Sequence, residues 1–345
     1  MKNTFGNAVS LTIFGESHGP AVGAVLDGLA AGLPVDEAAI AAALDRRRAR
    51  GDGLSTARTE ADEVEFLSGV YEGHTTGTAV TLMIRNLNTR SGDYAKTAGL
   101  LRPGHADFTA HAKYEGWQDA RGGGHFSGRL TAASVAAGAL CETVLRQLGV
   151  RVCTHIAACA GVEDAPLSSA AGLALPEPAP GHFALLDSGR EAAMQEAIRA
   201  AGRDGDSVGG ILETIVTGLP AGIGEPWFDS VESELAHLMF SIPACKGLEF
   251  GAGFRFAGMR GSEANDPFTM RDGRVVTATN RNGGINGGIT NGMPLVFRTV
   301  IKPTPSIYKE QHTVDYAARR DALLQIKGRH DPCIVPRAAV VQNTL

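Results

Sequence analysis

Glycine is the residue that most limits how this chain can fold. It accounts for 44 of the 345 residues, well above the usual share of roughly 7%, and it gathers in short clusters without a regular period. The clusters alternate with apolar segments, and hydrophobic residues make up 43% of the chain. Collagen needs a three-residue glycine period and disordered chains lack apolar residues, so both classes are excluded. The sequence predicts a globular protein with a large core and many loops shaped by glycine.

The charge balance excludes several classes of partner. The chain has 32 Lys and Arg against 37 Asp and Glu, a net charge of −5, so no basic face for nucleic acid is expected. No apolar run reaches the ~18 residues of a membrane span, and the first residues lack the layout of a signal peptide. The five cysteines are scattered and odd in number, which is typical of reduced thiols. We expect a cytoplasmic protein that binds neither nucleic acid nor membrane.

Hydrophobic periodicity predicts both helices and strands. Apolar residues three and four apart predict helices over residues 38–48, 129–148, 191–201, 230–240 and 314–326. Short β-branched or alternating segments predict strands over residues 10–14, 22–26, 79–84, 150–157, 210–217 and 294–301. Because helices and strands come in clusters and do not strictly alternate, an α+β fold is favoured over a doubly wound sheet.

The chain contains a short internal repeat. Residues 22–34 align without gaps to residues 208–220, with six of 13 positions identical. Each copy is interpreted as a strand, a Gly-Leu-Pro turn and a helix, which indicates internal duplication of a strand–turn–helix unit. The alternative is that Gly-Leu-Pro is simply a common way to end a strand.

Several loops combine glycine with histidine and arginine. Phe-Gly-Glu-Ser-His-Gly at 14–19 contains His18, and Arg-Pro-Gly-His-Ala-Asp at 102–107 contains His105. Arg-Gly-Gly-Gly-His-Phe-Ser-Gly-Arg at 121–129 precedes the long helix, where free N–H groups and a hydroxyl can cradle an anion. Histidine suits proton transfer near neutral pH, and arginine forks suit multiply charged anions. The set predicts a rigid site for an anionic, phosphorylated molecule with acid–base chemistry.

Each part has a plainer alternative. A histidine in a turn is often a hydrogen-bonded surface residue, and the arginines at 46–48 can simply complement the negative end of their helix. The glycine pairs at 283–292 can serve tight turns alone, and Cys333 is expected to be a buried, inert thiol. No metal site is expected, because no His-Glu-x-x-His or comparable pairing occurs. The P-loop and Rossmann fingerprints are also absent from the sequence.

Taken together and in order, these loops resemble those of the chorismate synthase family. The resemblance runs from residue 14 to residue 333, nearly the whole chain, and includes Lys-Gly at 246–247, Gly-Gly-Ile at 287–289 and Lys-Pro-Thr at 302–304. Half a dozen motifs in one order are far more specific than any single one.

The resemblance implies a lyase that forms chorismate and phosphate from 5-enolpyruvylshikimate 3-phosphate by 1,4-anti elimination. This is the last step of the shikimate pathway to the aromatic amino acids. Reduced FMN is the implied cofactor, used without net redox change. NADPH and an external flavin reductase are the candidate sources of reducing equivalents, and the absence of a visible reduction domain favours dependence on the reductase.

The family also implies a fold and an assembly. The expected fold is a layered sandwich with helices between two antiparallel sheets, in one domain over residues 1–345 with pseudo-repeat halves of about 1–150 and 151–345. The expected assembly is a homotetramer.

Site residues follow from the resemblance position by position. His18 is implied to balance charge at the departing phosphate, His105 to protonate the reduced flavin, and Asp331 to take part in proton removal near the flavin N5. The implied substrate contacts are Arg47, Arg129 and Arg337. The implied flavin contacts are His125, Phe126, Ser127, Pro243, Ala244, Gly287, Lys302, Pro303, Thr304, Pro305, Ser306 and Arg329.

The chain departs from the family's pattern in three places. His125 and Phe126 replace a common Arg-Ser pair, and Gly-Asp-Gly at 51–53 lies where many relatives carry an arginine, which weakens a pyridine-nucleotide contact there. The chain also stops soon after Arg337, where relatives usually continue through another helix. On the residues alone two other functions stay open: a flavin oxidoreductase acting on a phosphorylated substrate, and a non-catalytic protein that binds a phosphorylated ligand.

Overall fold

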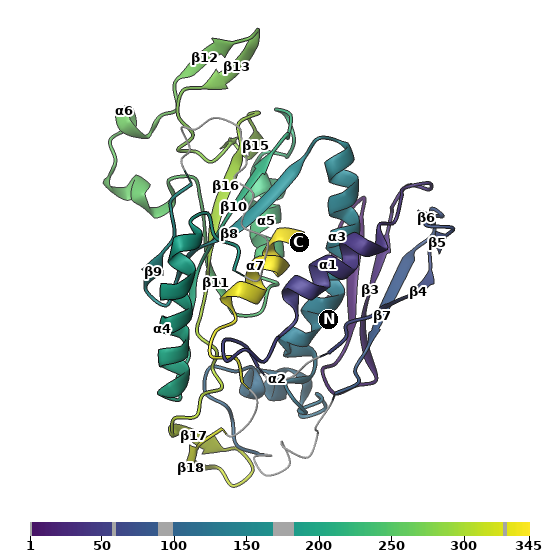
Figure 1. Ribbon diagram of the computed structural model, residues 1–345, viewed down its shortest axis with the longest axis vertical. Helices are drawn as coiled ribbons and strands as arrows, with labels where there is room; N and C mark the ends of the chain where they lie inside the picture. The colour runs from purple at the N-terminus through teal and green to yellow at the C-terminus, as the bar shows by residue number, and fades with distance from the viewer. Residues whose placement is uncertain (1, 57–59, 89–98, 168–182, 327–329) are drawn as a thin grey trace.

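Two five-stranded antiparallel sheets organise the computed structural model (Figure 1), which describes residues 2–56, 60–88, 99–167, 183–326 and 330–345. The first sheet has the order β1 (Thr4–Gly6), β2 (Ser10–Gly15), β3 (Ala21–Asp27), β7 (Val80–Arg85) and β4 (Val64–Ser68). The second has the order β11 (Cys245–Phe250), β16 (Leu295–Ile301), β10 (Gly210–Thr217), β8 (Arg151–Cys159) and β9 (Val162–Glu163). With the helices, these sheets make a mixed α+β fold.

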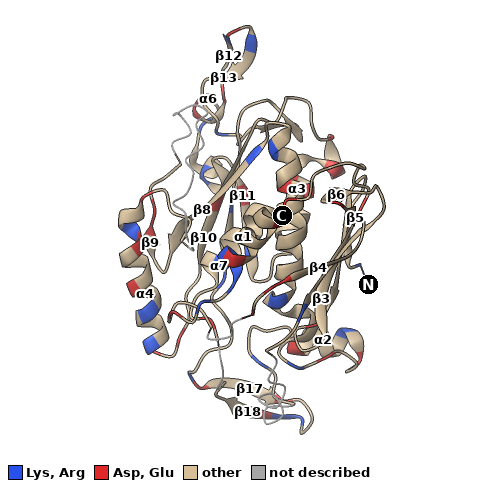
Figure 2. Ribbon diagram, turned by 45° about the vertical axis from the view of Figure 1, so that its right-hand side comes forward, with Lys and Arg blue, Asp and Glu red and all other residues tan. Residues whose placement is uncertain are grey.

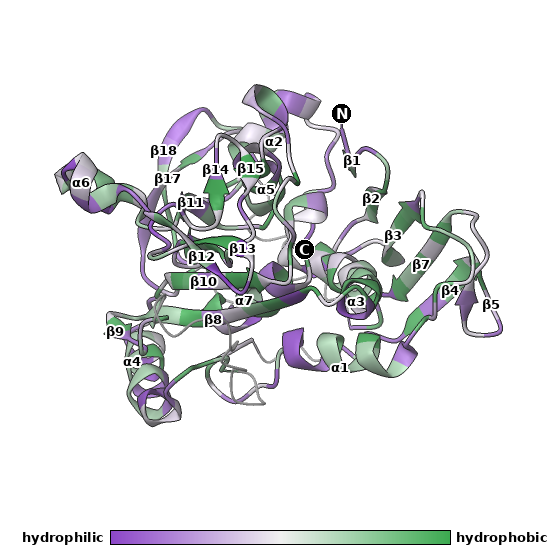
Figure 3. Ribbon diagram, turned by 90° about the horizontal axis from the view of Figure 1, so that it is seen from above, coloured by the Kyte–Doolittle hydropathy of each residue, from purple (hydrophilic) through white to green (hydrophobic). Residues whose placement is uncertain are grey.

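Three helices form the centre of the molecule: α1 (Glu37–Arg47), α3 (Thr131–Gln147) and α7 (Val335–Thr344). In Figures 1 and 3, α3 and α7 pack against each other; α3 also contacts β3, β7 and β8, and α7 contacts β8 and β10. The α3 helix is rich in alanine, and Ala132, Ala133, Ala136 and Ala137 are fully buried. Small side chains let neighbouring elements approach the helix axis closely.

The remaining helices lie outside this centre: α2 (Asp107–Tyr114), α4 (Glu191–Arg203), α5 (Val231–Met239) and α6 (Gly261–Ala264). The α4 helix buries Met194 and Ile198 and carries acidic and basic residues along its outer face (Figure 2). None of the helices in the described part of the chain is long and apolar enough to span a bilayer.

Most of the predicted elements are confirmed. The helices expected near 38–48, 129–148, 191–201 and 230–240 are α1, α3, α4 and α5. The six expected strands are β2, β3, β7, β8, β10 and β16. The helix predicted over 314–326 is wrong, because β17 (Gln311–Asp315) and β18 (Arg320–Leu324) form an antiparallel hairpin there.

Tertiary pairing explains this failure. Arg319 adopts a left-handed φ of 52° in the turn, and Asp315 Oδ1 accepts a hydrogen bond from Ala318 N at 2.9 Å. The hairpin is held from outside, since Leu101 N donates to Val314 O at 3.1 Å. These contacts override a helical periodicity that is only a weak preference.

β3 and β10 are the middle strands of their sheets, and the turns that follow them have the same conformation. Gly28 and Gly218 follow the two strands directly with φ of 90° and 84°, and Gly32 and Gly222 follow four residues later with φ of 82° and 101°. Only glycine adopts these angles without strain. Equivalent glycines are therefore 190 positions apart, not the 186 of the gapless sequence alignment.

A threonine holds each of the two turns in the same way. Thr75 lies at the end of the small hairpin β5 (Val70–Tyr71) and β6 (His74–Thr75), and Thr290 at the end of β14 (Ile285–Asn286) and β15 (Ile289–Thr290). Each hydroxyl donates to a turn carbonyl and accepts from a turn N–H; the partners are Ala30 O and Leu33 N for Thr75, and Pro220 O and Ile223 N for Thr290.

The contact between α3 and α7 leaves no room at Gly138. A Cβ there would lie 2.0 Å from the backbone oxygen of Thr344. We predict that Gly138→Ala destabilises the chain by about 1–3 kcal/mol, because α7 must shift to relieve the overpacking. Gly202→Ala in α4 is the matched control, since its Cβ would meet the ring of Pro332 at no less than 3.4 Å. Urea unfolding measures both, and a Gly138→Ala variant as stable as the parent contradicts the prediction.

Candidate active site

A cavity of about 1060 Å³ lies where loops from both halves of the chain meet. Its lining is strongly basic, although the whole chain has a net charge of −5. Three acids line it, Glu60, Asp62 and Asp331, against eight cations: Lys2, Arg47, Arg48, Arg102, Arg129, Lys246, Lys302 and Arg337. Concentrated charge of one sign in a concave site attracts ligands of the opposite sign. The cavity is therefore suited to a polyanion.

Three consecutive glycines hold two histidine loops together. Gly122 has a φ of 64°, and a Cβ there would lie 2.1 Å from Cε1 of His18. Gly123 has a φ of 106°, and its Cβ would lie 3.2 Å from Cε1 of His105. Both glycines are needed for their backbone angles and for the space that the imidazole rings occupy. The carbonyl of Gly124 completes the contact by accepting from Ser17 N at 3.1 Å.

His18 is oriented by its neighbour Ser17. The Ser17 hydroxyl lies 3.1 Å from His18 Nδ1 and donates to the carbonyl of Arg121 at 3.3 Å. Ser17 is fully buried beside the glycine run, while His18 is partly exposed and lines the cavity. The sequence motif at 14–19 thus carries both a histidine and the group that orients it.

His105 is oriented by a carboxylate. Its Nδ1 lies 2.9 Å from Asp107 Oδ1, and Arg102 donates to the same carboxylate from Nε at 2.8 Å and from Nη2 at 2.6 Å. Partial burial raises the pKa of Asp107, but the hydrogen bonds from His105 and Arg102 outweigh this and hold that pKa well below its usual range. The carboxylate is therefore charged at neutral pH.

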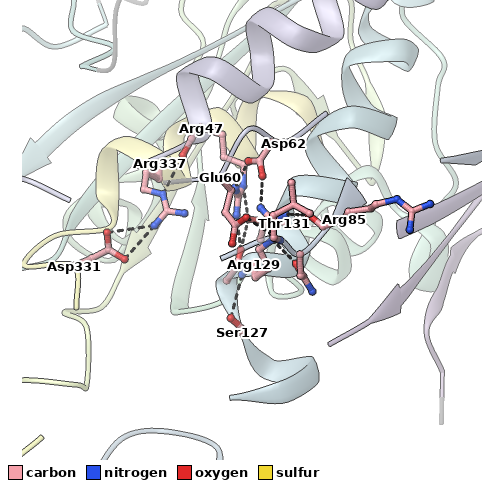
Figure 4. A network of polar contacts seen from close by, with 12 residues as sticks. Arg47, Glu60, Asp62, Arg85, Ser127, Arg129, Thr131, Asp331 and Arg337 are labelled. Atoms are coloured by element: carbon pink, nitrogen blue, oxygen red, sulfur yellow. Dashed lines mark hydrogen bonds and ion pairs between the residues drawn. The ribbon is translucent and has the colours of Figure 1, made fainter. Parts of the chain in front are cut away.

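A buried carboxylate lies between two guanidinium groups (Figure 4). Asp62 contacts Arg47 Nη1 at 3.2 Å with one oxygen and Arg129 Nη1 with the other. The exposed fraction of each of the three side chains is 5% or less. Burial, with a further contribution from nearby Arg337, lowers the pKa of Arg47 to about 9, so this arginine is still charged at neutral pH. Two cations share one anion, which leaves a net positive charge in the cavity wall.

The other nitrogens of both arginines are also bonded. Arg47 donates from Nε to Thr131 Oγ1 at 2.9 Å and from Nη2 to Gly128 O at 2.8 Å. Arg129 donates from Nε to Asn86 Oδ1 at 2.9 Å. These bonds fix the end of α1 to the start of α3 and make the wall rigid.

Asp331 belongs to a second ion pair at the far side of the wall. Arg337 Nη1 lies 3.2 and 3.1 Å from the two Asp331 oxygens, and its Nε donates to Arg47 O at 3.0 Å. Asp331 Oδ1 also accepts from Thr56 N at 2.8 Å. Arg337, the third residue of α7, thus joins the Asp331 loop to the end of α1.

A loop from the second half of the chain forms one side of the cavity. Lys302 donates from Nζ to Gly104 O at 2.6 Å, and its backbone N donates to Ala244 O at 3.0 Å. Ala244 has a φ of 71°, an unfavourable conformation for a residue with a side chain. These contacts place the segments at 243–244 and 302–306 beside the His105 loop.

The cavity collects most of the predicted site residues. Those that line it are His18, Arg47, His105, His125, Phe126, Ser127, Arg129, Pro243, Ala244, Lys302, Thr304, Pro305, Ser306, Asp331 and Arg337. Pro303 lies between lining residues, and Arg329 lies outside the described residues. Gly287 does not line this cavity, because it is in the turn between β14 and β15, whose end Thr290 fixes to the Pro220 turn. No cluster that could hold a metal occurs among the described residues.

Sequence reasoning missed several residues of the site, Asp62 and Asn86 among them. Asp62 and Asn86 hold the arginine pair, yet neither lies in a glycine–histidine cluster. Asp62 belongs to an acidic stretch, Glu-Ala-Asp-Glu at 60–63, that is typical of a solvated loop. The signal that could have indicated it is physical: buried arginines need a carboxylate partner.

The α+β fold and the basic, histidine-containing cavity define an enzyme that acts on an anionic small molecule. The profile of the chorismate synthase family matches residues 9–345. The chain is 48% identical over 343 residues to chorismate synthase of Methanosarcina mazei, covering 99% of this chain and 93% of that protein. It is 46% identical over 345 residues to that of Korarchaeum cryptofilum, covering 99% and 94%. A crystal structure of chorismate synthase matches with a TM-score of 0.75 at 28% identity, covering 97% of this chain and 88% of that one.

The chain therefore belongs to the chorismate synthase family. It is a lyase that converts 5-enolpyruvylshikimate 3-phosphate to chorismate and phosphate, the last step of the shikimate pathway.

The shared carboxylate gives a test of the cavity wall. We predict that Asp62→Asn lowers the free energy of unfolding by about 3–5 kcal/mol, because two buried guanidinium groups lose their counter-charge. Asparagine tolerates the left-handed φ of 55° at this position, so the backbone is not strained. Glu65→Gln, which breaks an exposed pair with Arg85, is the control and should change stability little. Equal urea midpoints for Asp62→Asn and the parent chain would refute the prediction.

Proposed function

We propose that the substrate and reduced FMN bind together in the basic cavity and that its histidines assist the loss of phosphate. The observation that carries this proposal is the convergence of His18 and His105 on the glycine run at 122–124, within a lining of eight cations. The substrate brings two carboxylates and a phosphate, which match a lining of that sign.

The residues present fit a flavin. Among the described residues, Thr304 Oγ1 and His330 Nε2 are buried without a hydrogen-bond partner, and both residues line the cavity. Such atoms are costly unless a ligand or water satisfies them. The segments at 125–127, 243–244 and 302–306 would hold the cofactor, with Arg329 as a further contact and Gly287 contributing only from outside this cavity. Reduced FMN held there would supply transient electron donation for the loss of phosphate, without net redox change.

Side chains of the cavity provide the positive charge and the proton-transfer groups for the reaction. The wall formed by Arg47, Asp62 and Arg129 keeps a net positive charge, and its rigid geometry costs no reorganisation when phosphate departs. His18 balances charge at the departing phosphate, and His105 holds a proton at the cavity. Asp331, kept in place by Arg337 and Thr56 N, takes part in removing the ring hydrogen as a proton.

The arrangement of elements supports the layered sandwich and the two pseudo-repeat halves, about 1–150 and 151–345 within a single domain over 1–345. The repeated turn after β3 and β10, with its threonine, supports their origin by duplication. A homotetramer fits a set of exposed apolar side chains, two of which are on the hairpin of β12 (Phe268–Arg271) and β13 (Arg274–Thr277) seen at the top of Figure 1. These side chains are Trp227, Phe228, Phe254, Phe268 and Met270, whose exposed fractions are 65% or more.

We also propose a cytoplasmic location, supported by five cysteines that form no disulfide. Reducing equivalents come from NADPH or from an external flavin reductase. Gly-Asp-Gly at 51–53 favours the reductase, because many relatives carry an arginine there and its absence weakens a pyridine-nucleotide contact.

The cofactor proposal predicts chorismate formation without flavin consumption. Under anaerobic conditions, the chain with photoreduced FMN and 5-enolpyruvylshikimate 3-phosphate should give many turnovers while the flavin absorbance returns to its reduced spectrum. Omitting FMN is the control and should abolish product. Stoichiometric flavin oxidation would indicate an oxidoreductase, and equal rates without FMN would exclude the flavin.

Each of the two cavity histidines should contribute to turnover on its own. We predict that His18→Ala and His105→Ala each lower turnover by about 10²- to 10⁴-fold, the usual range for lost acid–base assistance. His74→Ala, at an exposed position in β6, is the control and should keep the parent rate. Single-turnover formation of chorismate measures each rate, and near-parent rates for both cavity variants would overturn the assigned roles.

A further inference from the structure

The carboxylate of Asp107 is hydrogen-bonded to both His105 and Arg102. Besides His105 Nδ1, its carboxylate accepts from Arg102 N at 2.9 Å and from the Arg102 side chain at two positions. All three residues belong to the turn at 102–107, in which Gly104 has a φ of 71°. Arg102 and Asp107 are largely buried, with exposed side-chain fractions of 13% and 21%. Because the guanidinium binds both oxygens, the carboxylate cannot rotate away from the imidazole.

This geometry determines which nitrogen of His105 carries the hydrogen. A charged carboxylate only accepts, so Nδ1 must donate to Asp107. The other nitrogen, Nε2, lies on the side of the glycine run, where a Cβ on Gly123 would be 3.3 Å from it. In the neutral ring Nε2 is therefore an acceptor, and in the charged ring it is a donor.

Other charged and titratable groups around the turn act on the same ring. Lys302 reaches the turn through Gly104 O, and His18 contacts the adjacent Gly122. His330 is on the Arg102 side, where burial first and Arg102 second lower its pKa. Among the described residues, Asp107 is the group that is hydrogen-bonded to the imidazole of His105.

We propose that Asp107 is a positioning residue for the elimination. It fixes the Nδ1–H tautomer of His105 and directs Nε2 toward the cavity, while Arg102 holds the carboxylate in place. The proposal rests on the role proposed above for His105, and it adds the group that sets that histidine's orientation and hydrogen.

Asp107→Asn tests the tautomer without changing the shape of the side chain. An amide presents either an oxygen or an NH₂ group to Nδ1, so the tautomer is no longer fixed. We expect kcat to fall by at least about 10- to 100-fold, the range seen when metal-bound histidines lose the group that orients them, with KM for the substrate within about twofold. Asp107→Glu should restore part of kcat. Glu65→Gln is the matched control, because Glu65 forms a similar two-bond pair with Arg85 at an exposed position outside the cavity.

Nitrogen-15 spectra of histidine-labelled full chain, with His105→Gln to identify the signal, give a readout independent of activity. The parent chain should show protonated Nδ1 and unprotonated Nε2 in the neutral ring, and Asp107→Asn should show a mixture. A parent chain with the opposite tautomer overturns the proposal even if Asp107→Asn does not fold. Full activity of Asp107→Asn with loss of activity in His105→Gln overturns the Asp107 proposal alone. Full activity of His105→Gln overturns the catalytic role of His105, and this proposal with it.

Discussion

The carboxylate of Asp62, buried between Arg47 and Arg129, is the interaction on which the site depends. Removing three charged side chains from water is expensive unless each is well paired. Here the pairing joins the end of α1, the loop before β4 and the start of α3. The cluster thus fixes three elements at one point and still leaves one positive charge for a ligand. A stable fold and an anion-binding wall come from the same few atoms.

On the other side of the cavity, glycine leaves space for the two histidine side chains. The run at 122–124 removes side chains where two imidazole rings approach the backbone, so that loops over 80 residues apart in sequence meet. Each histidine then takes its orientation from a different polar neighbour, a hydroxyl for His18 and a carboxylate for His105. Two histidines in one cavity can therefore differ in chemistry.

The parts of the site that are encoded by neighbouring residues could be predicted from the sequence. The glycine, histidine and arginine loops carry their signal in adjacent residues, and most of them line the cavity. Sequence reasoning failed where distant contacts decide: the helical pattern at 314–326 becomes a hairpin because it pairs with the segment at 99–101, and Asp62 resembles a surface acid until two arginines surround it. Gly287 lies in the turn of the separate two-stranded hairpin β14–β15, outside the cavity lining. The roles of the individual site residues remain predictions.

The hydrogen bond from Lys302 to the carbonyl of Gly104 joins the two halves of the chain at the cavity. Lys302 follows the last strand of the second sheet, and Gly104 belongs to the histidine loop of the first half. The cavity is therefore absent from either half alone and forms only when both sheets are complete and docked. Because α7 also supplies Arg337, which holds Asp331 in place, a chain without this helix has an incomplete site even when both sheets have formed.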